Sequence, residues 1–142
     1  SVGSALLQTK AAGWLAQLIV SHLGLQMASA FAILMLLSAF LIVIHLGFAS
    51  ATALTSAMLP ILISVLLSLP GDFSRLGMTM LLGFVVSYGF ILPINAPQNM
   101  VCLGTETFSA RQFAKVGVLV TLIGYLSMLL FAVTWWRWLG WI

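Results

Sequence analysis

Two short polar islands interrupt an otherwise apolar chain, and their residues could bind an anion. The first island runs from His45 to Ser56 and includes Ser50 and Thr52, and the second runs from Pro93 to Asn99. Irregular backbone at membrane depth is tolerated only where it is buried in protein or lines a watery cavity, because unpaired N–H and C=O groups are costly in hydrocarbon. The two islands therefore predict a binding site.

The chemistry of these islands depends on helix N-termini. Ser50 or Thr52 can cap a helix that starts in the first island, which leaves backbone N–H groups and the positive end of the helix dipole free. In the second island Pro97 can start a short helix, with the amides of Asn95 and Asn99 around it. Two facing N-termini would bind an anion without a buried cation. The alternative, that these residues only pack and kink membrane helices, stays open.

Other chemistry has little support in the sequence. His45 borders the first island and either carries a proton or bonds a nearby carbonyl. No Asp or Glu lies inside an apolar segment, and the single Cys102 belongs to no metal or redox motif. We therefore expect neither an enzyme nor a cofactor, apart from a sodium ion considered below.

The composition is that of an integral membrane protein. The chain is 63% hydrophobic and 5% charged, and its mean hydropathy is +1.22, whereas soluble domains carry about 25% charged residues. The five Lys and Arg residues form no cluster, so a nucleic-acid partner is excluded. The first expected partner is the lipid bilayer.

Segment lengths predict how the first island is held. The apolar run 27–44 is long enough to cross, or nearly cross, a hydrocarbon core of about 30 Å. The run 57–69 would cover only about 20 Å as a helix. Residues 27–69 are therefore predicted to form a re-entrant helical hairpin with its tip at 45–53. The competing interpretation is two ordinary spans joined at 47–50.

The rest of the chain completes an all-α membrane protein. Residues 76–105 are predicted to form a transmembrane helix broken at the two prolines of the second island. Residues 106–115 are expected to be a cytoplasmic loop, by a weak excess of basic residues. Residues 116–142 form the last transmembrane helix, with a Trp-rich interfacial end.

Residues 1–26 are expected to be the end of a transmembrane helix and an interfacial connector. They lack an initiator methionine and a signal-peptide pattern. Because the spans are too few for most transporters, we expect the chain to be the C-terminal half of an inverted-repeat transporter. The alternative is a complete chain that pairs with a second copy in the opposite orientation.

The islands resemble motifs of the divalent anion/sodium symporter (DASS) superfamily, whose members carry Ser-Asn-Thr at the tips of two re-entrant hairpins. The matching residues here are Phe-Ala-Ser-Ala-Thr-Ala at 48–53. About forty residues later, Leu-Pro-Ile-Asn-Ala-Pro-Gln-Asn at 92–99 is similar to the family's Leu-Pro-x-x-Thr-Pro-x-Asn. The segment 104–108 and the last helix are also similar to the family's ending.

The resemblance implies a site and its contacts. By this likeness Ser50 and the Asn95 carbonyl would help to hold a sodium ion. The residues that the likeness places at the substrate are Ser50, Ala51, Thr52, Ala96, Pro97 and Asn99.

Two positions depart from the family pattern. Ala51 stands where the family's asparagine often helps to bind sodium and substrate, and Ala96 stands where threonine is common. His45 before Phe-Ala-Ser-x-Thr-Ala is similar to bacterial citrate and dicarboxylate carriers and to the chloroplast 2-oxoglutarate/malate translocator, which exchange anions. Sodium symport and anion exchange therefore both stay open.

The function that the resemblance implies is secondary active transport of di- or tricarboxylate anions by an elevator-type mechanism. It further implies a homodimer, multi-pass in the cell inner (plasma) membrane, whose missing N-terminal half completes the site. The alternative from another class is a noncatalytic membrane subunit or scaffold, in which the islands are structural kinks.

Overall fold

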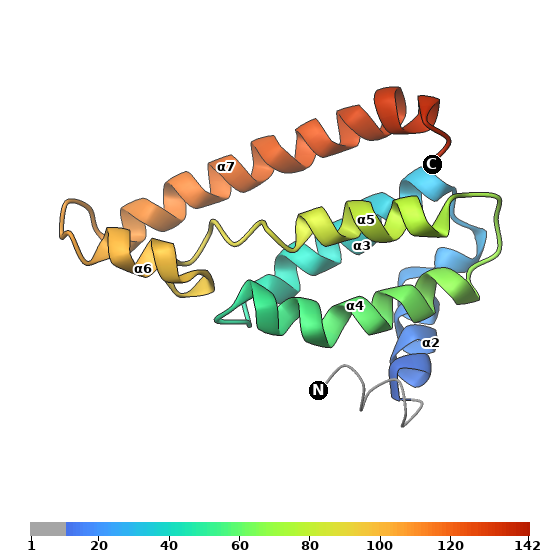
Figure 1. Ribbon diagram of the computed structural model, residues 1–142, viewed down its shortest axis with the longest axis horizontal. Helices are drawn as coiled ribbons and strands as arrows, with labels where there is room; N and C mark the ends of the chain where they lie inside the picture. Colours follow the sequence, from blue (N-terminus) through green and yellow to red (C-terminus); the bar gives the residue numbers. More distant parts are fainter. Residues whose placement is uncertain (1–10) are drawn as a thin grey trace.

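The protein is described by a computed structural model over residues 11–142, and that range contains six α-helices and no strand (Figure 1). The predicted all-helical class is confirmed. Part of the expected connector, residues 1–10, lies outside the described residues. The helices are α2 (Ala11–Leu23), α3 (Ala30–His45), α4 (Ala51–Ser68), α5 (Arg75–Val85), α6 (Pro97–Leu103) and α7 (Ala110–Phe131).

α3 and α4 run in opposite directions from a short turn, and α5 packs against both (Figure 1). The residues at this junction are nearly all aliphatic. In lipid these residues stabilise the fold mainly through close van der Waals packing, since lipid tails are as apolar as leucine. Fully buried examples are Leu34, Leu37 and Leu41 of α3, Leu54 and Leu62 of α4, and Leu81 and Leu82 of α5. α2 packs against α4.

Two helical stretches in the described part of the chain are long and apolar enough to cross a membrane. They are α4 and the stretch Ala110–Trp136, which joins α7 to a π-helical turn, η3 (Ala132–Trp136). α3 and α5 are apolar but shorter. These lengths agree with a membrane protein.

α4 is longer than the apolar run that we used to predict it. It begins at Ala51, directly after the predicted cap Ser50, whereas the apolar run that we used to judge its length begins only at Ala57. Serine and threonine remain in the helix because the Thr55 hydroxyl donates to the Ala51 carbonyl at 2.8 Å and the Ser56 hydroxyl to the Thr52 carbonyl at 2.9 Å. The helix covers about 27 Å, so the argument for a re-entrant arm from its short length does not hold.

The break in the predicted helix 76–105 begins earlier than its prolines. α5 ends at Val85, whereas the apolar run continues to Leu92. Tertiary contacts keep the chain after Val85 from continuing as a helix. One of them is the hydrogen bond from the Tyr88 hydroxyl to the Gly124 carbonyl of α7, at 3.1 Å. At Gly89 a Cβ atom would lie 3.1 Å from the His45 ring, so only glycine fits without displacement.

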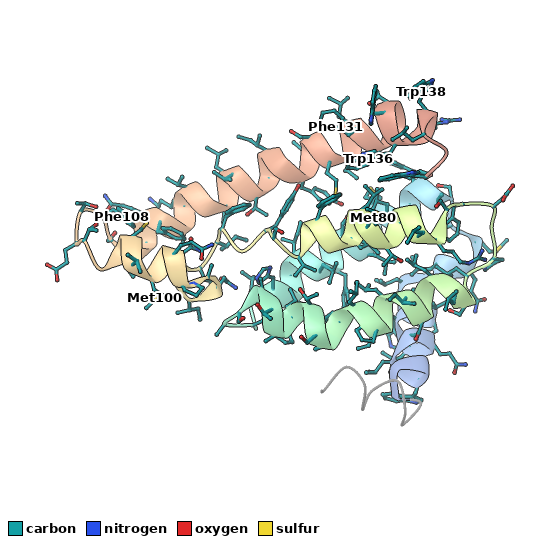
Figure 2. The ribbon with its side chains drawn as sticks, viewed as in Figure 1. Met80, Met100, Phe108, Phe131, Trp136 and Trp138 are labelled. Atoms are coloured by element: carbon teal, nitrogen blue, oxygen red, sulfur yellow. The ribbon has the colours of Figure 1, made fainter. Side chains whose placement is uncertain are left out.

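The predicted loop 106–115 is shorter in the structure, because α7 already begins at Ala110. Ser109 and Gln112 form a capping box, in which the Gln112 N–H donates to the Ser109 hydroxyl at 3.3 Å and the Ser109 N–H to Gln112 Oε1 at 2.8 Å. Arg111 and Lys115 therefore lie on the helix. At its other end, Trp136 is turned toward α5 and its ring centroid lies 6.1 Å from that of Phe131, whereas Trp138 points away (Figure 2).

Candidate functional site

The two islands meet at the side chain of Asn95, which is 2% exposed. Its Nδ2 donates to the His45 carbonyl at 2.7 Å and to the Phe48 carbonyl at 2.9 Å. Its Oδ1 accepts a hydrogen bond from the Leu92 N–H at 3.1 Å. We call this set of three bonds the Asn95 clasp; it joins the hairpin tip to the break after α5.

The clasp is explained by the end of α3. A helix leaves its last carbonyls without intrahelical partners, and His45 is the last residue of α3. The His45 carbonyl accepts from the Phe48 N–H at 3.1 Å as well as from Asn95, whereas the Phe48 carbonyl accepts from Asn95 alone among the described residues. Where water is absent, such a carbonyl needs a donor from the protein. A primary amide supplies two N–H groups and one acceptor, so a single asparagine serves both the hairpin tip and the break.

The clasp holds the tip next to the start of α4. Ser50 is the N-cap, in extended conformation, and its hydroxyl accepts from the Ala53 N–H at 3.4 Å. The N–H groups of Ala51 and Thr52 precede the first intrahelical bonds and can point at a ligand. Thr52 is exposed, and Ser50 and Ala51 are half-buried. This end of α4 has the donors that an anion needs.

The second island offers fewer donors than its sequence suggested. Pro97 is the first residue of α6 and has no N–H, and the Asn99 N–H donates to the Ala96 carbonyl at 3.1 Å. The Asn99 side chain donates to the Gly89 carbonyl at 2.9 Å. Asn99 therefore stabilises the irregular segment between α5 and α6. Of the two predicted helix N-termini, the one at the start of α4 has more free N–H donors.

Contacts with α7 place the break after α5 beside the middle of that helix. Tyr88 bonds Gly124, which is near the middle of the stretch Ala110–Trp136. α6 and the polar loop at 104–109 extend beyond the hairpin tip (Figure 1). The tip thus ends short of the polar loop that contains Glu106.

The described residues would supply only part of a sodium site. By the family likeness, the Ser50 hydroxyl and the Asn95 carbonyl oxygen would be two ligands, whereas hard cations take about six oxygens. Ala51 has no side-chain oxygen, and the Asn95 amide is already bonded within the clasp. These residues alone do not fit a sodium ion.

The His45 ring is 2% exposed, and neither nitrogen has a hydrogen-bond partner among the described residues. The nearby carbonyl partner that we considered for this ring is not found there. The ring instead packs against Gly89.

Sequence reasoning placed the Asn95 amide near the second helix N-terminus and missed its bonds to the hairpin tip. The available signal was an amide inside an apolar segment, which must find bonding partners when it is buried. It also missed Gly117, where a Cβ atom would collide with the Phe90 carbonyl. A small residue in a long helix is too common to identify such a contact.

Comparison with known proteins identifies the family of this chain. A family described as the sodium:sulfate symporter transmembrane region matches residues 2–142. A membrane protein of Cupriavidus necator is 69% identical over the whole chain, which spans 28% of that relative. An uncharacterized transporter of Haemophilus influenzae is 32% identical over 89 residues, which are 63% of this chain and 19% of that protein. No solved structure matches.

The family match covers nearly the whole chain and was anticipated from the residues 48–53 and 92–99. Its members are membrane transporters rather than enzymes. The chain belongs to the sodium:sulfate symporter transmembrane family, and thus to the DASS superfamily.

Proposed function

We propose that this chain is part of a secondary transporter for di- or tricarboxylate anions that works as a homodimer by an elevator-type movement in the cell inner membrane. The longer transporter would supply the other half of the site, a view supported by the 28% of the Cupriavidus relative that the chain spans. Residues 27–69 would act as a re-entrant hairpin, and the substrate would lie beside Ser50, Ala51, Thr52, Ala96, Pro97 and Asn99.

The observation that carries this proposal is the contact between the hairpin tip and the break. The Asn95 clasp keeps two irregular segments together, 47 and 50 residues apart in sequence. It leaves the first N–H groups of α4 and the hydroxyls of Ser50 and Thr52 available to a carboxylate. A fixed set of neutral donors at one helix N-terminus suits an anion that must be released again, because it adds no permanent buried charge.

The test is substitution at the start of α4. Ser50→Leu removes the cap hydroxyl and fills the space before the free N–H groups, so uptake of radiolabelled succinate or citrate into proteoliposomes should fall at least tenfold, the loss expected for about 1.4 kcal/mol of binding. Ser56→Leu is the matched control, since the Ser56 hydroxyl is bonded to the Thr52 carbonyl of its own helix. Equal uptake by the two variants, at equal amounts of folded transporter, would exclude this site.

A scaffold function is the second candidate, and one observation favours it. The Asn95 amide is buried and fully bonded within the chain, as expected for a dry structural kink. Ala51→Cys, with Cys102→Ser, distinguishes the two functions. A transporter predicts labelling by a membrane-impermeant thiol reagent that added carboxylate slows, whereas a packed scaffold predicts none.

The coupling ion is tested separately. Uptake with sodium replaced by choline, and with or without internal dicarboxylate, separates symport from exchange. Dependence on internal dicarboxylate alone would favour exchange, which agrees with the incomplete set of sodium ligands around Ser50 and Asn95.

A further inference from the structure

An apolar groove runs between α3 and α7, outside the candidate anion site. Its walls are Ala39, Ile42 and Val43 on α3 and Val118 and Leu122 on α7. Val43 is 65% exposed, and Val118 and Leu122 are each 52% exposed. The small Ala39 side chain leaves room in one wall.

The two hydroxyl groups that border the groove are both used by the protein. Thr121 Oγ1 donates to the Gly117 carbonyl at 2.8 Å, and Tyr125 Oη donates to the Met35 carbonyl at 2.8 Å. The hydroxyl hydrogens of Thr121 and Tyr125 are therefore bonded to backbone carbonyls. The surface of the groove is almost entirely apolar. Such a surface fits a hydrocarbon chain.

The α7 wall continues directly into two cations. Arg111, Lys115, Val118, Leu122 and Tyr125 follow one another at intervals of four, three, four and three residues, so they share one face of the helix. Arg111 and Lys115 are exposed. From Arg111 to Tyr125 the helix rises about 21 Å, which is comparable to one phospholipid from its phosphate well into its acyl chain.

The position of these cations is not explained by helix stability. Arg111 and Lys115 lie in the first two turns of α7, where the positive end of the helix dipole disfavours a cation. Among the described residues, neither forms an ion pair with Asp72 or Glu106, the two acidic side chains of the chain. Both are therefore available to a negative group outside the chain.

We infer that this face binds an anionic phospholipid, with an acyl chain in the groove of α3 and α7 and its phosphate at Arg111 and Lys115. The site is independent of the carboxylate proposal. It would fasten the outer face of α7 to the leaflet that borders the loop at 104–109.

Lipid contact can be measured in the full-length transporter with a fluorescent label in the groove. Val43→Cys, in a full-length transporter otherwise freed of cysteine, is labelled with bimane and reconstituted with brominated phosphatidylglycerol or brominated phosphatidylcholine of the same chains. Quenching should reach half its maximum at a lower fraction of phosphatidylglycerol than of phosphatidylcholine. Since each basic residue near the surface contributes about fivefold, the preference should be on the order of 20-fold.

Arg111→Gln with Lys115→Gln should abolish the preference for phosphatidylglycerol and keep quenching by both lipids. Arg137→Gln is the matched control, because it removes an exposed cation at the other end of the same helix, and it should keep the preference. Equal quenching by the two lipids in the unsubstituted protein would overturn the inference. So would absence of labelling or quenching at position 43, which would show that another part of the transporter covers the groove.

Discussion

At the scale of single residues, the candidate site depends on one asparagine. Asn95 bonds two carbonyls at the hairpin tip and one N–H in the break. In a soluble protein, water could replace such bonds; at membrane depth the unpaired groups would remain costly. Asn95 therefore positions Ser50 and its neighbours, and the site should tolerate little change there.

Asn95→Leu should destabilise the full-length transporter by about 3 kcal/mol, because it leaves the Phe48 carbonyl without its donor and the Leu92 N–H without its acceptor. Asn99→Leu is the comparison, since its side chain makes a single bond, to the Gly89 carbonyl, and it should cost about 1 kcal/mol. The measurement is the midpoint of thermal unfolding in detergent. Similar midpoints for the two variants would contradict a special role of the clasp.

At the scale of elements, α7 supports the break by approaching it very closely. Gly117 faces the backbone at Phe90 and Ile91, and Gly124 lies against the Tyr88 ring. The two glycines differ in what surrounds them: a Cβ at 117 would strike a carbonyl, whereas a Cβ at 124 would lie 3.4 Å from the ring, an ordinary contact. Only the first position requires glycine for packing.

Gly117→Ala should therefore push α7 away from the break and lower stability by about 3 kcal/mol, the upper part of the range for overpacking. Gly124→Ala should have little effect or raise stability slightly, since alanine favours the helix by about 1 kcal/mol. Thermal unfolding of both variants checks this order. The reverse order would show that α7 is not packed on the break as described.

At the scale of the whole molecule, the polar turns lie at opposite ends of the helices. The turn between α4 and α5 contains Asp72, and the loop between α6 and α7 contains Glu106 and Thr107 (Figure 1). With a membrane across these helices, the two turns would face opposite compartments.

In a cysteine-free full-length transporter, Asp72→Cys should react with an impermeant maleimide in intact cells. Thr107→Cys should react only after the cells are permeabilised, because the basic residues that follow it favour the cytoplasm. Both positions are exposed. Labelling of both cysteines in intact cells would contradict this orientation.

The sequence predicted features that local chemistry decides. A serine before a helical run predicted the cap at Ser50, and proline in the second island predicted the start of α6 at Pro97. It did not predict that α5 ends at Val85, because no helix breaker stands there. That end depends on contacts of Tyr88 and Gly89 with distant segments, and neither periodicity nor residue type reveals such contacts.

The clasp also imposes an order on synthesis and membrane insertion. The carbonyls of His45 and Phe48 leave the ribosome about 50 residues before the amide of Asn95 that bonds them. Until then, the His45 carbonyl has the Phe48 N–H as a partner, but the Phe48 carbonyl lacks its donor. An unpaired carbonyl disfavours leaving the hairpin deep in hydrocarbon. The hairpin should reach its final depth only after the second island has been made, so defects at Asn95 should reduce the yield of folded transporter before they affect its turnover.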